Sequence, residues 1–138
     1  MLKYSITFAI GMNTDLQHKE EKTIWTIGHS TRSLDNFITM LQSFGITQLV
    51  DVRHFPGSRK FPHFNKEALM VTLPEANIAY EHIEQLGGRR KVNPHSFNTA
   101  WRNKAFRGFA DHMETDEFKA GIDVLTAAAL KETIVLMC

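Results

Sequence analysis

Side chains that can carry chemistry follow the short apolar runs of this sequence. In parallel sheets, ligands bind outside the carboxyl ends of the strands. If the runs are such strands, histidine, carboxylate, guanidinium, hydroxyl and thiol groups meet there, and we predict one anion-binding cleft. The residues at or beyond the ends of the runs are Gly28, His29 and Ser30, then Asp51 and Arg53, then Gly87, Gly88, Arg89 and Arg90, and last Cys138.

His29 and Asp51 are the predicted catalytic residues. An imidazole transfers protons near neutral pH, although a histidine that only bonds a neighbouring loop is also consistent with the sequence. An isolated carboxylate at the end of a buried strand is costly, so Asp51 needs a partner. We expect Asp51 to orient His29 or an arginine such as Arg53; the alternative is a structural carboxylate that holds loop amides.

The residues predicted to bind the anion are glycines, hydroxyls, arginines and one aromatic. Glycine lets the backbone approach an anion at a helix start, so residues 28–31 resemble a phosphate-binding turn, although a plain tight turn explains them too. The planar fork of arginine meets two phosphate oxygens at once. The predicted set is Gly28, Ser30, Arg53, Ser58, Arg59, Gly87, Gly88, Arg89, Arg90, Trp101 and Arg107.

The segment 86–108 is strongly basic within a chain of formal net charge +1. It holds six Lys or Arg residues and no Asp or Glu, and Phe97, Trp101 and Phe106 are interleaved with them. Arginine beside aromatic rings suits phosphates, with or without stacked bases. The alternative is a solvated basic loop, but a loop of roughly 20 residues by itself favours a function.

The elements that must position these groups alternate along the chain. Runs rich in β-branched residues predict strands at 23–27, 46–52, 78–83 and 133–137. Apolar residues at helical spacing predict helices between them, the first capped by Ser33 and the last by Thr115, with the second ending before Pro74. This order predicts a single three-layer α/β domain over 23–138, with a mostly parallel sheet of about four strands.

The two ends of the chain carry separate expectations. Residues 1–22 lack periodicity and include the charge run at 19–22, so we expect a poorly ordered extension. The closing strand runs directly into Cys138, from which we expect that C-terminal elements of the domain are missing.

Composition excludes several classes of protein. No apolar run reaches the roughly 20 residues of a membrane span, so no membrane partner is expected. The single cysteine, Cys138, rules out an internal disulfide framework and favours a cytoplasmic location, with a buried inert thiol as its simplest role. The seven histidines lack metal-binding spacing, so no metal is predicted, and the sequence names no cofactor.

Seven motifs follow one another along the chain: TIGHSTRS from Thr26, LVDVRHFPGSR from Leu49, FN at Phe64, EQLGGRR from Glu84, WRN from Trp101, FRGFA from Phe106 and LMC from Leu136. In this order they resemble the motifs of the domain-of-unknown-function family 488, and the resemblance runs from about Thr23 to Cys138. The resemblance implies an α/β domain that continues past Cys138, with a Cys-Ala-Glu start and a later Cys-His-Arg segment. It implies no reaction and no established catalytic residues.

Two functions fit these observations best, and a small structural or interaction protein is a third reading. The first is an enzyme acting on a phosphate-containing substrate, a nucleotide or nucleic acid, in the cleft. The second is a non-catalytic nucleic-acid-binding module that uses the segment 86–108. Clustering of His29 and Asp51 with the arginines would favour the enzyme, and arginines spread over a flat face would favour the module.

Overall fold

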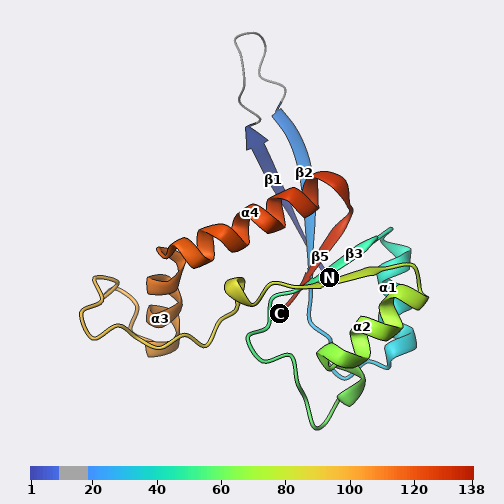
Figure 1. Ribbon diagram of the computed structural model, residues 1–138, viewed down its shortest axis with the longest axis horizontal. Helices are drawn as coiled ribbons and strands as arrows, with labels where there is room; N and C mark the ends of the chain where they lie inside the picture. Colours follow the sequence, from blue (N-terminus) through green and yellow to red (C-terminus); the bar gives the residue numbers. More distant parts are fainter. Residues whose placement is uncertain (10–18) are drawn as a thin grey trace.

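The computed structural model of the protein describes residues 1–9 and 19–138. Four parallel strands lie in the order β2 (Lys19–Ile27), β5 (Ile134–Met137), β3 (Gln48–Asp51) and β4 (Ala79–His82), so the last strand is inserted between the first two parallel strands. β1 (Leu2–Ala9) adds an antiparallel edge beside β2. The sheet is thus mostly parallel, as predicted (Figure 1).

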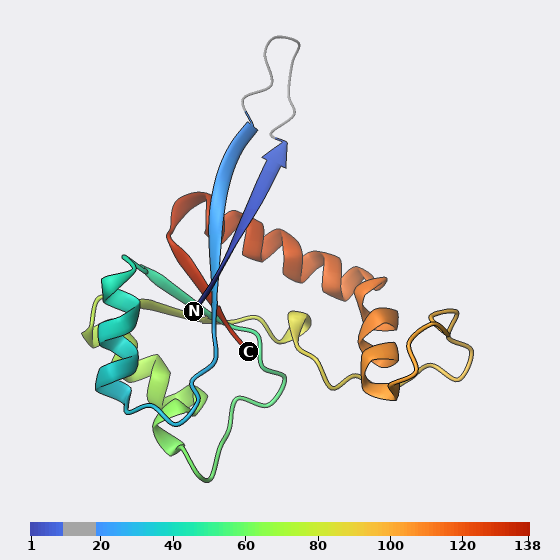
Figure 2. The same cartoon turned by 180° about the vertical axis from the view of Figure 1, so that it is seen from behind.

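Helices cover both faces of the sheet. α1 (Leu34–Ser43) and α2 (Lys66–Glu75) lie on one face, and α4 (Asp116–Lys131) crosses the other (Figures 1 and 2). Successive strand residues supply alternate faces: Leu49 packs with α1 and α2, whereas Val50 packs with α4. The predicted three-layer α/β class is confirmed.

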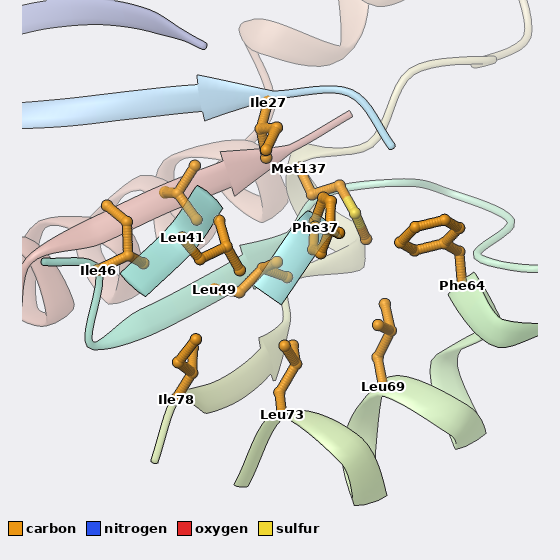
Figure 3. Close-up of a cluster of buried hydrophobic side chains, with 11 residues drawn as sticks. Ile27, Phe37, Leu41, Ile46, Leu49, Phe64, Leu69, Leu73, Ile78 and Met137 are labelled. Carbon is orange, nitrogen blue, oxygen red and sulfur yellow. The ribbon is translucent and has the colours of Figure 1, made fainter. Parts of the chain in front are cut away.

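The larger core lies between the sheet and the first two helices. Phe37, Leu41, Leu69 and Leu73 project from α1 and α2 toward Leu49 of β3 (Figure 3). All five side chains are fully buried. Burial of such a side chain contributes roughly 1.5–3 kcal/mol, so this layer holds the strand ends in place.

The caps at the helix ends follow the local sequence. The Ser33 and Thr115 hydroxyls accept the backbone N–H groups of Asn36 and Phe118, as predicted. The prediction that α2 stops before Pro74 is wrong, because Pro74 lies inside the last turn and the helix ends at Glu75. Proline lacks only its own N–H, and the turn is closed by the N–H of Ala76 to the Leu73 carbonyl.

The N-terminal part of the chain differs from the poorly ordered extension expected over 1–22. Residues Leu2–Ala9 pair antiparallel with Lys19–Thr26, and the two strands project past the other strands (Figure 1). Backbone hydrogen bonds hold this antiparallel ladder, and they do not require an apolar periodicity. Residues 10–18 lie outside the described part of the chain.

The segment after β4 leads away from the sheet and returns. It contains the short 3-10 helix η2 (Glu84–Leu86), a long loop and α3 (Lys104–Met113), which runs into α4. The His112 ring ties α3 to η2, since its Nε2–H donates to the Gln85 carbonyl at 2.6 Å. None of the described helices is long and apolar enough to cross a bilayer.

Candidate active site at the strand carboxyl ends

A cleft of about 490 Å³ lies at the carboxyl ends of the parallel strands. The turn after β2, the loop after β3, the segment after η2 and the residue after β5 all contribute to its wall, and α3 closes one side. The predicted convergence of strand ends is therefore present in the fold. The lining residues are His29, Val52, Arg53, His54, Phe55, Leu86, Gly88, Arg89, Phe109 and Cys138.

His29 is held in the cleft by ring contacts and one hydrogen bond. Its ring stacks on Phe64 of η1 (Pro62–Phe64), with centroids 4.7 Å apart, and meets the edge of Phe61. The Nδ1 atom lies 2.8 Å from the carbonyl oxygen of Ser30. Because a carbonyl only accepts, Nδ1 carries the proton and Nε2 of the neutral ring keeps a free lone pair. Nε2 can therefore act as a general base.

Asp51 lies behind the cleft wall and is fully buried. One carboxylate oxygen accepts the backbone N–H of Arg53 at 3.1 Å and Nε–H at 2.8 Å; the other accepts Nη2–H at 2.5 Å and the Tyr80 hydroxyl at 2.8 Å. These bonds fill the acceptor sites of the carboxylate. Two partners were expected for Asp51, His29 or an arginine, and in the structure its partner is Arg53. Asp51, one of the two predicted catalytic residues, does not line the cleft.

The network around Asp51 fixes Arg53 from several sides. The Arg53 Nη2 also donates to the Phe64 carbonyl at 2.8 Å, and the His82 ring donates from Nε2 to the Arg53 carbonyl at 2.8 Å. Burial, followed by the Asp51 carboxylate, raises the pKa of Tyr80, so Tyr80 remains a donor at neutral pH. Arg53 lines the cleft with a side chain that is only 13% exposed. These bonds hold the side chain rigidly, and the Asp51 carboxylate neutralises its charge.

Arg89 and Arg90 are neighbours with different surroundings. Arg89 has a left-handed backbone (φ +59°), is exposed and lines the cleft. Arg90 turns instead to η2, where its guanidinium donates to the carbonyls of Gly87 and Glu84 at 3.0 and 2.7 Å, and it reaches Glu117 of α4. Arg89 therefore belongs to the wall of the cleft, whereas the guanidinium of Arg90 joins η2 to α4.

Other residues predicted to bind the anion have structural contacts. Ser58 holds its own loop, accepting the Phe61 N–H and donating its N–H to Asn65, while Arg59 is exposed outside the cleft lining. Arg107 donates to the Trp101 carbonyl and lies outside the cleft lining. Gly28 lines a neighbouring hollow that shares Cys138 with the cleft, and Ser30 provides the carbonyl that fixes His29.

Sequence reasoning missed His54 and Phe109 as cleft residues and expected Cys138 to be buried. His54 directly follows Arg53, so its position after a strand end could have indicated it. Its Nδ1 is shielded from solvent and lies 3.3 Å from a Glu84 carboxylate oxygen, without hydrogen-bond geometry.

Cys138 is exposed on the cleft wall, contrary to the expectation of a buried thiol. Among the described residues, no three His, Cys, Asp or Glu side chains gather as metal ligands.

Gly87 sets the distance between the two loops of the cleft. A Cβ at this position would lie 2.9 Å from the backbone nitrogen of His54 and 3.0 Å from its Cα. Backbone atoms cannot move aside cheaply, so we expect Gly87→Ala to destabilise the protein by about 1–3 kcal/mol.

Gly88→Ala is the matched control, because a Cβ at Gly88 meets nothing within 4 Å. We expect chemical denaturation to show a clear loss for the first variant and a change within about 0.5 kcal/mol for the second. Equal unfolding free energies of the two variants would contradict the packing argument.

The comparison with known families decides what this chain is related to. The model of DUF488, a domain of unknown function, matches residues 33–138. The chain belongs to the DUF488 family. The match spans the cleft residues from Val52 to Cys138 and begins four residues after His29, so the first resembling motif lies mostly before the matched part. No curated protein and no solved structure was found to match this DUF488 chain.

Proposed function

We propose that this DUF488 protein is an enzyme that acts on a phosphate-bearing substrate in the cleft. The observation that supports it is the meeting of His29, with a free Nε2 lone pair, and the exposed cation of Arg89 on the wall of one cavity. A volume of about 490 Å³ is within the range of small-molecule sites. It is sufficient for a nucleotide-sized ligand.

The two arginines of the cleft have different roles in this proposal. Arg53 is paired with Asp51, so the pair adds donor atoms and rigidity but little net charge. Arg89 contributes the positive charge and meets the phosphate oxygens through its planar fork. His29 moves the proton at the reacting group, with Phe64 and the Ser30 carbonyl keeping its ring in place.

Anion binding tests the first half of this proposal. At low salt, sulfate, inorganic phosphate and AMP should raise the melting temperature of the protein, since screening is weakest there. Arg89→Asn should abolish the rise, because it removes the charge while asparagine tolerates a left-handed backbone. Arg59→Asn, an exposed arginine outside the cleft lining, is the control and should keep it. The same loss in both variants would contradict the proposal.

Turnover tests the second half. Phosphate release should be measured for nucleoside monophosphates and triphosphates, with wild-type protein and His29→Gln. General acid–base catalysis contributes roughly 10²–10⁴-fold, so His29→Gln should lower a measured rate by at least about 100-fold while anion binding persists. Turnover that is unchanged in His29→Gln, or absent with every substrate of this set, would contradict the enzymatic assignment.

A nucleic-acid-binding module without catalysis is the second candidate. The feature that favours it is exposed aromatic surface beside the basic residues of the segment 86–108. Phe97 is 97% exposed, Phe106 58% and Trp101 50%. Oligonucleotide binding together with no turnover would select this function over the enzyme.

A further inference from the structure

An apolar depression of about 260 Å³ lies along α3. Four of its residues, Phe106, Phe109, Ala110 and Met113, repeat at helical spacing and share one face, and Trp101 comes from the loop before the helix. The Trp101 and Phe106 rings meet edge to face, with centroids 5.9 Å apart. Trp101, Phe106 and Met113 are about half exposed, so large flat apolar surface faces solvent here.

The aromatic rings of this depression are held by specific bonds. Asn103 caps α3 by accepting the Ala105 N–H at 2.8 Å. From the next turn, Arg107 donates through Nε and Nη2 to the Trp101 carbonyl, at 3.1 and 2.9 Å. The backbone that carries Trp101 is thereby fastened to the helix that carries Phe106, so the two rings form a preorganised surface.

Acidic and basic side chains both lie around α3. Asp111 accepts from Ser96 and Asn98, and these bonds, with that of Asn98 first, lower the pKa of Asp111. Glu114 accepts from Asn98 as well. The acidic groups thus hold the loop 93–98. The exposed charged residues of the adjoining loop and helix start are basic: Lys91, Arg102 and Lys104.

Phe109 connects the depression with the cleft, because it lines both. Phe109 therefore lies between the cavity of His29 and Arg89 and the depression of Trp101 and Phe106. We infer that the substrate of the cleft is a single-stranded nucleic acid, with a phosphate at Arg89 and a neighbouring base stacked in the depression. This inference rests on the proposed phosphate site and names its substrate class.

Charge and shape favour this occupant over a second copy of the chain or an amphipathic peptide. Cations beside the aromatic rings complement a polyanionic backbone, and base–aromatic stacking is tolerant of sequence. In a duplex the bases are paired and stacked on one another, so their faces are not free to cover Trp101. Single strands should therefore bind more tightly than duplexes of the same sequence.

Fluorescence anisotropy tests this inference by measuring the affinity of the protein for a labelled oligothymidylate. A length of about ten nucleotides lies within the site sizes of single-strand-binding proteins. We expect Trp101→Ala combined with Phe106→Ala to weaken binding about tenfold or more. Phe44→Ala removes an aromatic side chain of similar exposure (43%) at the far end of α1 and should leave the affinity unchanged. The single variant Phe106→Leu keeps an apolar side chain and should lose less oligonucleotide affinity. It keeps the test valid if the double variant does not fold.

The outcomes separate this inference from the proposed function. If sulfate and AMP still stabilise the protein through Arg89 but the double variant binds the oligonucleotide as wild type does, the inference is wrong and the phosphate site stands. If Arg89→Asn also leaves anion binding intact, both are wrong. Equal affinity for single strand and duplex would overturn the stacking role. A change of oligomeric state in the double variant, with unchanged oligonucleotide affinity, would show that the depression is a self-association surface.

Discussion

Asp51→Asn should destabilise the protein by about 3–5 kcal/mol, although Asp51 lies outside the cleft lining. The carboxylate is fully buried and accepts from Arg53 and Tyr80 through both oxygens. An amide of the same shape removes the negative charge and turns one acceptor into a donor that faces other donors. The guanidinium is then left in a buried position without its counter-ion.

Thermal and chemical unfolding measure this effect. A loss of that size corresponds to a fall of about 10 °C or more in melting temperature for a domain of this length. Tyr80→Phe is the graded control, because it removes one hydrogen bond to a charged group and should cost about 1.5–3 kcal/mol. If Asp51→Asn unfolds with wild-type stability and loses only anion binding or turnover, Asp51 acts in the cleft and the structural role is wrong.

Phe64→Ala should cost about 3–5 kcal/mol, the usual range for emptying a buried aromatic site. Phe64 is fully buried, meets Phe37 of α1 edge to face with centroids 5.0 Å apart, and stacks beneath His29. The substitution keeps the backbone carbonyl that Arg53 uses, so the loss reports on packing. It also removes the support of the His29 ring, and we expect weaker AMP binding under conditions in which the variant is folded.

Phe97→Ala is the matched control for this prediction. It removes the same atoms from a side chain that is 97% exposed, so its unfolding free energy should stay within about 0.5 kcal/mol of wild type. Urea denaturation at equilibrium compares the two variants directly. Comparable losses at Phe64 and Phe97 would contradict the placement of Phe64 in the core.

Both predictions concern residues that support the cleft from behind. Arg53 and His29 have limited freedom because Asp51, Tyr80 and Phe64 contact them on the buried side. A site held in this way keeps its geometry before the ligand arrives, which lowers the ordering cost of binding. We therefore expect the stability and the anion affinity of this DUF488 domain to fall together in these variants.

The sequence by itself determined the elements and the edge of the sheet where the cleft lies. Apolar β-branched runs and 3.6-residue periodicity are local properties, so the four parallel strands and the capping by Ser33 and Thr115 could be predicted. The carboxyl ends of parallel strands share one edge whatever their order. For this reason His29, Arg53 and Arg89 could be assigned to one cleft without knowing which strands are neighbours.

Only the tertiary structure decided what each polar side chain does at that edge. Arg89 and Arg90 have the same chemistry, yet a left-handed backbone turns one to the cleft while the carbonyls of η2 hold the other. Asp51 could be expected to bind either His29 or Arg53, and the choice of Arg53, together with the hydrogen bond from Tyr80 of the adjacent strand, came from the tertiary structure. Such assignments depend on contacts between residues far apart in the sequence, and neither spacing nor composition records these contacts.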